Sequence, residues 1–330
     1  MLRSSTCRLR PFPKWRFTWS ALLIAAGVCG CGDTLQSLVL RPSKEIRRTP
    51  EEFGFTYETL TLTDENGTPI SAWRVPTTSE TKLGTIVVVP GNDANKGRYT
   101  VGLQFFVDFG WDVILFDYQG FGESGGAATF DGLITSTRAV FKHATENDPV
   151  VAGLGISLGA PVLIRMAAEF DLAAIVMDGT VNIWEITTQW TDSHGLGNDL
   201  FGIGNAVAAL SSTEDFDTVR WVAQVTEPKL FVHSMADNVA PFEGALDLYR
   251  AAPSPKHFFI VEGEHATAQF FDPGLYRNII NAWLTSIVLH DEEFTQQYLA
   301  ILDEEVRATL LELGLITPEQ AAGLTVSGGG

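Results

Sequence analysis

The stretch VVAGLGISLGAPVLIRMAAE, residues 150–169, decides the fold of this chain. Its first five residues are apolar and favour a strand, and residues 160–169 have the composition of a helix. Between them lies Gly155-Ile156-Ser157-Leu158-Gly159, where two glycines relieve the crowding of a sharp turn. A strand, a sharp turn and a helix in this order predict that Ser157 projects from the edge of a sheet as a nucleophile.

A second segment, Gly122-Glu123-Ser124-Gly125-Gly126, has the same Gly-x-Ser-x-Gly spacing. The spacing alone therefore does not identify a nucleophile, and the flanking elements have to decide. Ser124 lies in a glycine-rich stretch with no helix directly after it, whereas Ser157 has both the strand and the helix. We expect Ser157 to be functional and Ser124 to belong to a structural turn.

Short apolar runs recur along the chain and alternate with helical stretches. The runs are residues 85–89, 113–116, 150–154, 174–177, 230–233 and 257–261. Because they lack polar alternation, they predict strands buried on both faces of a mostly parallel sheet flanked by helices, which is an α/β fold. Ahead of them, residues 57–62 and 69–73 flank Asn66-Gly67, a pair that predicts an antiparallel hairpin at the start of the sheet.

The first thirty residues have the order of a targeting signal, with a basic stretch up to Arg16 and then an apolar run over 17–28. That run is shorter than the about 20 apolar residues that span a bilayer. It ends in Val28-Cys29-Gly30-Cys31, which resembles a bacterial lipobox, where the cysteine after a small residue is lipidated and becomes the new first residue. We predict a lipoprotein-type signal peptide over 1–30, with lipidation such as palmitate at Cys31. An ordinary secretory peptide and an uncleaved anchor are the alternatives.

The charge of the chain limits its partners. The formal net charge is −18, and loss of the five basic residues of the targeting segment leaves 17 basic residues against 40 acidic ones, a net charge of −23. A surface this negative repels phosphate backbones and anionic headgroups, so nucleic acid is excluded as a partner and charge alone does not bind a membrane. All three cysteines lie within the first 31 residues, so a chain that begins at Cys31 has no internal disulfide.

The pattern divides the chain into a targeting segment and one large domain. Residues 31–54 are expected to form an N-terminal linker and residues 55–290 the α/β domain. About residues 179–219, rich in Gly, Asn, Trp and Phe, interrupt the α/β alternation and predict an inserted cap. Residues 291–330 are acidic, with apolar residues at helical spacing, and predict a helical tail.

A serine hydroxyl becomes a strong nucleophile when an imidazole can take its proton and a carboxylate orients that imidazole. After Ser157, Asp237 and His265 each follow the end of a predicted strand. Both therefore fall at the carboxyl edge of the sheet, where open α/β folds bind ligands. We predict a catalytic triad of Ser157, His265 and Asp237.

Other residues compete for two of these roles. Asp178 ends the preceding strand, and its carboxylate is an alternative to that of Asp237. The other histidines are expected to be structural or solvated: His143, His194, His233, His257 and His290. The oxyanion also needs two backbone N–H donors. One is expected from Leu158, directly after the nucleophile, and the other from the loop that begins at Pro90.

With these residues in place, the chain resembles the α/β-hydrolase superfamily over roughly residues 55–289, and in particular the bacterial serine-aminopeptidase-like hydrolases. Their His-Gly-Asn loop corresponds to Pro90-Gly91-Asn92. Their Asp-x-x-Gly-x-Gly-x-Ser loop corresponds to residues 117–124, and their acid motif to residues 233–241. The resemblance implies the α/β-hydrolase fold with an inserted cap, and it assigns one oxyanion N–H to Asn92. Pro90 departs from the pattern, because proline has neither an N–H nor an imidazole to brace the loop.

The expected activity is hydrolysis of a carboxylic ester or a related acyl bond through an acyl-enzyme on Ser157. A serine aminopeptidase-like peptidase and a non-catalytic, membrane-anchored binding protein with the same fold are the alternatives. No metal or organic cofactor is expected, since the sequence has no cluster with metal-ligand spacing and Gly120-x-Gly122 is too short for a dinucleotide motif. The expected partners are a small-molecule or acyl substrate and, through the lipid, a membrane. This places the protein in the bacterial cell envelope, periplasmic or at the cell surface. The pattern does not indicate an oligomeric state.

Overall fold

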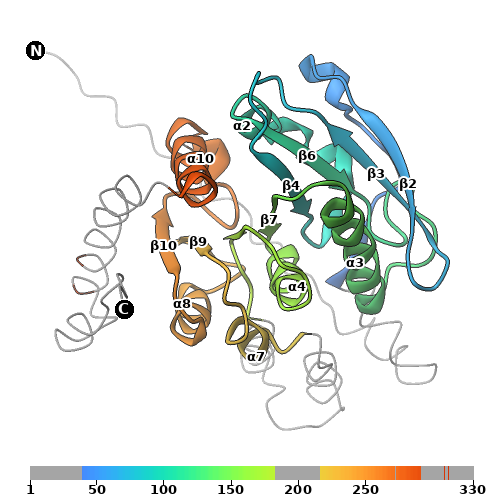
Figure 1. Ribbon diagram of the computed structural model, residues 1–330. Coiled ribbons are helices and arrows are strands. Elements are labelled where there is room, and N and C mark those ends of the chain that lie inside the picture. Colours follow the sequence, from blue (N-terminus) through green and yellow to red (C-terminus); the bar gives the residue numbers. More distant parts are fainter. Residues whose placement is uncertain (1–38, 183–215, 272, 291–307, 309–310, 312–330) are drawn as a thin grey trace, which may run out of the picture.

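The computed structural model describes residues 39–182, 216–271, 273–290, 308 and 311 (Figure 1). Its main feature is an eight-stranded sheet in the order β10-β9-β8-β7-β4-β6-β3-β2. The strands are β2 (Glu58–Thr63), β3 (Pro69–Val75), β4 (Gly84–Val89), β6 (Trp111–Phe116), β7 (Val151–Ile156), β8 (Ala174–Asp178), β9 (Lys229–Ser234) and β10 (Lys256–Val261).

The strand directions confirm the predicted fold class. All six apolar runs form strands, β4 and β6 to β10, and these pair in parallel. The predicted hairpin is β2 and β3, which pair antiparallel, and β3 is also antiparallel to β6. Its turn has Gly67 at a φ of +81°, a conformation that favours glycine. The Asp64 carboxylate accepts from the backbone N–H groups of Asn66 and Thr68 at 2.9 and 2.8 Å and fixes the turn.

Helices cover both faces of the sheet (Figure 1). One face carries α3 (Phe130–Asn147), α4 (Gly159–Ala167), α7 (Thr218–Val222) and α8 (Phe242–Ala251), and the other carries α2 (Gln104–Val107) and α10 (Pro273–Leu289). Side chains alternate along the strands, so that Val87 and Val89 belong to the core of the first face while Ile86 and Val88 belong to that of the second. In the described part of the chain, no helix is long and apolar enough to cross a membrane.

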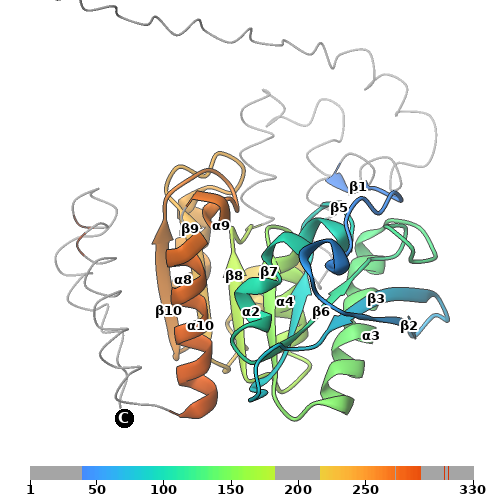
Figure 2. The same ribbon diagram turned by 90° about the horizontal axis from the view of Figure 1, so that it is seen from above.

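The segment before the domain differs from the predicted linker. Residues 39–54 pack on the domain, with Leu40 only 2% exposed and in contact with the core of the first face. Here β1 (Arg41–Pro42) pairs in parallel with β5 (Asp93–Ala94), and η2 (Pro50–Phe53) follows. We call residues 39–45 the N-terminal strap. Figure 2 shows β1 and β5 at the same edge of the sheet as α9 (Ala268–Phe271).

Several predicted features lie outside the described residues. These are the signal peptide over 1–30, the lipidation site Cys31, most of the cap, His194 and nearly all of the helical tail. The predictions for these features therefore stay predictions.

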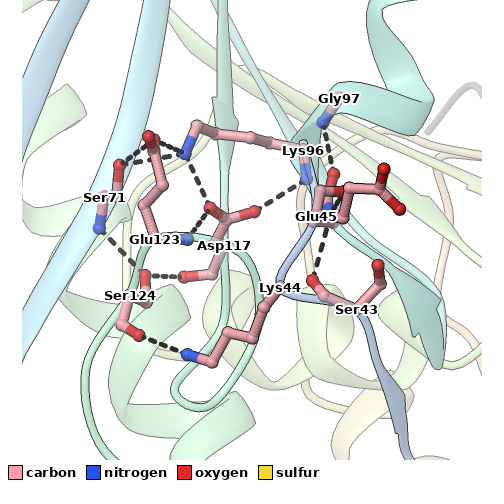
Figure 3. Close-up of polar contacts among 10 residues, drawn as sticks. Ser43, Lys44, Glu45, Ser71, Lys96, Gly97, Asp117, Glu123 and Ser124 are labelled. Atoms are coloured by element: carbon pink, nitrogen blue, oxygen red, sulfur yellow. Dashed lines mark hydrogen bonds and ion pairs between the residues drawn. The ribbon is translucent and has the colours of Figure 1, made fainter. Parts of the chain in front are cut away.

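The sequence analysis does not predict that Lys96 is fully buried. Lys96 joins the loops at the edge of the sheet that carries β1, β5 and α9 (Figure 3). Lys96 lies in η3 (Lys96–Gly102), and its Nζ is 2.6 Å from Asp117 Oδ2, 2.7 Å from Glu123 Oε2 and 4.6 Å from the centre of the Trp73 ring. The hydrogen bond from Lys96 lowers the pKa of Glu123. Buried charges persist only when they are paired, so Lys96 fixes residues 117–124 against η3.

Candidate active site

The turn between β7 and α4 has the geometry that the sequence predicts. Ser157 has a φ of +54°, a left-handed conformation that costs free energy for a residue with a Cβ. A Cβ at Gly155 would lie 2.6 Å from the Cα of Ala160, and a Cβ at Gly159 would overlap the carbonyl oxygen of Val89. Both positions therefore require glycine. The turn is further fixed because the Ser157 N–H donates to the Asp178 carbonyl at 2.8 Å.

Ser157, His265 and Asp237 form one hydrogen-bonded chain across three loops. The Nε2 of His265 is 2.8 Å from Ser157 Oγ, and its Nδ1 is 2.7 Å from Asp237 Oδ2. The His265 side chain is 16% exposed, whereas the Asp237 side chain is completely buried. With the proton on Nδ1 donated to Asp237, Nε2 is free to accept the proton of the Ser157 hydroxyl.

The surroundings of Asp237 keep its carboxylate ionised. Burial raises its pKa, but hydrogen bonds from His265 and from the backbone N–H groups of Ala240 and Val239 outweigh burial, so that the pKa lies below its ordinary value. The two backbone bonds reach Oδ1 and measure 2.8 and 2.9 Å. A carboxylate that stays charged at neutral pH can stabilise the imidazolium that forms during proton transfer.

The neighbouring His233 helps to shape the turn that carries Asp237. Its Nε2 donates to the Ala240 carbonyl at 2.9 Å, and its side chain is completely buried. Burial lowers its pKa, so the ring is neutral at physiological pH. His233 thus has a structural place, as the sequence analysis expects.

Asp178, the alternative acid, has a different partner. Its Oδ2 accepts from the Tyr276 hydroxyl at 2.7 Å, and its side chain makes no hydrogen bond to a described histidine. Burial raises its pKa to about 6, against a smaller opposing effect of the Tyr276 hydrogen bond. A hydroxyl donor and a raised pKa make Asp178 a poorer orienting group for an imidazole than Asp237.

The alternative serine is structural in its contacts. Ser124 is 3% exposed, its Oγ donates to the Asp117 carbonyl at 2.7 Å and accepts from the Ser71 N–H at 2.9 Å. These bonds tie the glycine-rich loop to β3. No described histidine contacts Ser124 through a hydrogen bond.

The loop after β4 lies against the serine. A Cβ at Gly91 would lie 3.5 Å from Ser157 Cβ, so the two loops are in contact. Within the described residues, neither the Asn92 nor the Leu158 backbone N–H makes a hydrogen bond.

Two tyrosines, the buried Tyr118 and the partly buried Tyr99, hold this loop at Pro90, where the sequence departs from the pattern of the hydrolases that it resembles. The Tyr118 hydroxyl donates to the Pro90 carbonyl at 2.7 Å, and the Tyr99 hydroxyl accepts from the Gly91 N–H at 2.8 Å. Burial raises the pKa of Tyr99 to about 12. Sequence reasoning missed both tyrosines, because nothing in the sequence around either one indicates which loop it contacts.

A small cavity of about 40 Å³ lies between η3, α2, β6, β7 and α10. It is lined by Tyr99, Leu103, Phe105, Ile156, Gln269 and Tyr276, among others. Ile156 directly precedes the nucleophile, and Tyr99 contacts the oxyanion loop, so the cavity adjoins the site. In the described part of the chain, no group of three or more His, Cys, Asp and Glu side chains is placed to bind a metal ion.

Comparisons with known proteins agree with the fold. No family model matches the chain. The "uncharacterized protein YfhR" of Salmonella typhi is 27% identical over 234 residues, which are 64% of this chain and 75% of that protein. An esterase of Pyrococcus furiosus, Pf2001, superposes with a TM-score of 0.62 at 18% identity, over 79% of this chain and 98% of that one. The esterase EaEST of Exiguobacterium antarcticum gives a TM-score of 0.53 at 16% identity, over 69% and 100%.

The carboxyl of Asp178 predicts a pH dependence of stability. Its pKa rises from 3.8 in the unfolded chain to about 6 in the folded one. Its contribution is therefore fully present below about pH 4 and is lost as the pH rises through about 6, by up to roughly 3 kcal/mol. Asp178→Asn keeps an acceptor for Tyr276 but cannot ionise. We expect its free energy of unfolding, relative to the wild type, to rise between pH 4 and pH 7 in urea titrations.

Asp247→Asn is the control for loss of a negative charge, since Asp247 lies in an exposed pair with Arg250. A difference between Asp178→Asn and the wild type that is the same at pH 4 and pH 7 would contradict the prediction.

Proposed function

Since the chain has the α/β-hydrolase fold, we propose that it is a serine hydrolase that cleaves a carboxylic ester through an acyl-enzyme. The observation that carries the proposal is the position of His265, whose two ring nitrogens lie 2.8 Å from Ser157 Oγ and 2.7 Å from Asp237 Oδ2. Nucleophile, base and orienting acid are thus within hydrogen-bond reach of one another, which is the arrangement that this chemistry requires.

The proposed reaction runs in two steps. Ser157 Oγ attacks the ester carbonyl carbon while His265 Nε2 takes the hydroxyl proton, and the negative oxygen binds the Asn92 and Leu158 N–H groups. The C–O bond to the alcohol then breaks, and His265 returns the proton to the leaving alcohol. In the second step, water attacks the acyl-Ser157 ester with His265 as base, and the carboxylic acid leaves while the proton returns to Ser157 Oγ.

An ester of a short acyl group is the substrate class that we propose. The structural neighbours include esterases from two organisms, and the cavity beside Ile156 is largely apolar. A site of roughly 10–15 Å³ holds one water, so a cavity of about 40 Å³ has room only for a short chain. Phe105, a buried residue of α2, closes part of it.

We further propose that the protein is a lipoprotein anchored at Cys31. The chain enters the domain at Val39, whose carbonyl accepts from the Asn92 side chain. Cys31 precedes Val39 by eight residues. Eight residues span at most about 28 Å, so the anchor would hold the oxyanion loop within about that distance of a membrane surface.

Reactive-site labelling tests the triad. A fluorophosphonate probe is expected to label the wild type and Ser124→Ala but not Ser157→Ala, because only Ser157 has a base beside it. His265→Ala is expected to slow labelling by several orders of magnitude, and Asp237→Asn to slow turnover by about 10⁴-fold. The rate of fluorescence incorporation and the steady-state rate are the measurements.

Asp178→Asn is the matched control, since it changes the other carboxyl at the carboxyl edge of the sheet. Labelling of Ser124 in the Ser157→Ala variant would show that the wrong serine was chosen. A folded wild type that takes no label at all would favour a binding protein.

A substrate panel tests the ester and its acyl length. We expect the highest kcat/KM with p-nitrophenyl acetate to butyrate, a fall at longer chains, and little release from aminoacyl-p-nitroanilides. Phe105→Ala enlarges the cavity and should shift the optimum toward longer chains. Faster cleavage of the anilides than of the esters would point to the peptidase instead, and an unchanged chain-length profile in Phe105→Ala would place the acyl group elsewhere.

Cell fractionation tests the anchor. In bacteria that process lipoproteins, the wild type and Cys29→Ser are expected in the membrane fraction, and Cys31→Ser in the soluble fraction or as an uncleaved precursor. Retention of mature Cys31→Ser on membranes, or release of Cys29→Ser, would contradict lipidation at Cys31.

A further inference from the structure

Four polar atoms near the tip of the loop of Asn92 make hydrogen bonds. The Pro90 carbonyl and the Gly91 N–H bind the two tyrosines described above. The Asn92 carbonyl accepts from the Arg41 N–H at 2.8 Å, and the Asn92 side-chain amide donates to the Val39 carbonyl at 2.9 Å. Within the described residues, the N–H of Asn92 makes no hydrogen bond. This is the atom that the proposed reaction needs.

Two of these bonds come from the N-terminal strap. They continue into a short parallel ladder, in which Arg41 pairs with Asp93 and Pro42 with Ala94. The Asn92 carbonyl and side chain are both attached to the Cα that also carries the Asn92 N–H, so holding both limits the directions in which this residue can move. The strap thus acts on the residue that carries the oxyanion donor.

The strap is itself anchored beyond the loop (Figure 3). Leu40 is buried in the core, and the Ser43 carbonyl accepts from the Gly122 N–H at 2.9 Å. The Asn95 side-chain amide donates to the Ser43 and Glu45 carbonyls at 3.0 and 2.8 Å. The Lys44 ammonium donates to the Ser124 carbonyl at 2.9 Å.

The contact between the Ser43 carbonyl and Gly122 connects the strap to the buried ion pair of Lys96. Gly122, which donates to the strap, leaves no room for a Cβ beside the Asp117 carboxylate, and Asp117 is paired with Lys96. The strap therefore bridges the loop after β4 and a rigid loop after β6. The strap thus connects the loop that carries Asn92 to a rigid support.

We infer that residues 39–45 are a positioning element that holds the Asn92 N–H in place for the oxyanion, in the role that the missing loop histidine would otherwise share. This inference rests on the proposed serine-hydrolase function. A strap that only stabilises the fold would affect the number of folded molecules, whereas a positioning strap sets the rate of each folded molecule.

Two substitutions of Arg41 separate these two cases. Arg41→Pro removes the N–H that binds the Asn92 carbonyl, and Arg41→Ala keeps that N–H while removing the same exposed side chain. Complete loss of an oxyanion donor costs about 10²- to 10³-fold in kcat. We expect Arg41→Pro, in which the donor is displaced rather than lost, to lower kcat by about 10- to 100-fold. Arg41→Ala should stay within about twofold of the wild type.

Asn95→Asp provides a second variant that does not alter the strap itself. The Asn95 Oδ1 accepts from the Gly97 N–H at 3.1 Å, and aspartate keeps that acceptor. It replaces the two donors to the strap by a negative oxygen that faces two carbonyls, so the strap should detach. Glu45→Gln, which removes an exposed charge from the strap, is its control.

Each rate is measured on the full chain and divided by the concentration of sites titrated with the fluorophosphonate. The affinity for a short alkylboronic acid, which forms a tetrahedral adduct on serine, is measured in parallel. For Arg41→Pro and Asn95→Asp we expect a lower kcat per titrated site and a boronate Ki raised by a similar factor. KM and the pH profile, which depend on substrate binding and on His265, should stay as in the wild type.

Unchanged kcat per titrated site and unchanged boronate Ki in both variants would overturn the inference while leaving the proposed function intact. Loss of activity only in proportion to the loss of titratable sites would overturn it in the same way, since the strap would then be structural. A wild type that neither reacts with the probe nor hydrolyses any ester would overturn the proposed function, and the inference with it.

Discussion

The close approach of α4 to the end of β4 is the constraint on which the site depends. Gly159 leaves no space for a side chain against the Val89 carbonyl, and this contact sets the helix directly over the strand that leads to Asn92. The turn at Ser157 is sharp because the helix must begin there, and the left-handed φ follows from it. Steric fit therefore brings together the nucleophile and the loops that carry both predicted oxyanion donors. The polar contacts hold the same geometry.

Burial and hydrogen bonding together shift the pKa values of two carboxyls at the same edge of the sheet in opposite directions. Asp178 ends β8 and Asp237 follows the end of β9, and burial raises the pKa of each. Three hydrogen bonds, one from His265 and two from the backbone, reverse this for Asp237, whereas a single Tyr276 hydroxyl does not do so for Asp178. The difference in donor number therefore leaves the pKa of Asp178 raised and that of Asp237 lowered. The carboxylate with the lowered pKa is the one bonded to His265, so the turn of residues 237–240, rather than the strand end alone, makes an acid suitable for the triad.

The sequence predicted the strands and the site residues Ser157, His265 and Asp237 because each depends on a local signal. A β-rich apolar run predicts a buried strand, and a residue just past such a run falls at the ligand-binding edge. The same rule could not separate Asp178 from Asp237, since both satisfy it and the deciding partner, Tyr276, lies 98 residues from Asp178. Lys96 was missed because lysine is among the residues least often buried, and its two carboxylate partners lie 21 and 27 residues further along the chain. Residues 39–54 were assigned to a linker because their composition has no clear period.

The place where the chain departs from the pattern of the hydrolases that it resembles is also the place where the strap binds. Pro90 can neither donate an N–H nor offer an imidazole, so the loop needs other contacts to stay ordered. Tyr118 binds the carbonyl of Pro90 itself, and the strap binds Asn92 two residues later. A contact made by backbone atoms of the strap can persist through changes of its side chains, which explains why no motif marks it. With an acidic surface that repels anionic headgroups, attraction by charge cannot orient the domain at a membrane. A tether that enters beside the oxyanion loop would orient it instead, so one segment would both hold the catalytic loop and direct its edge toward the proposed membrane.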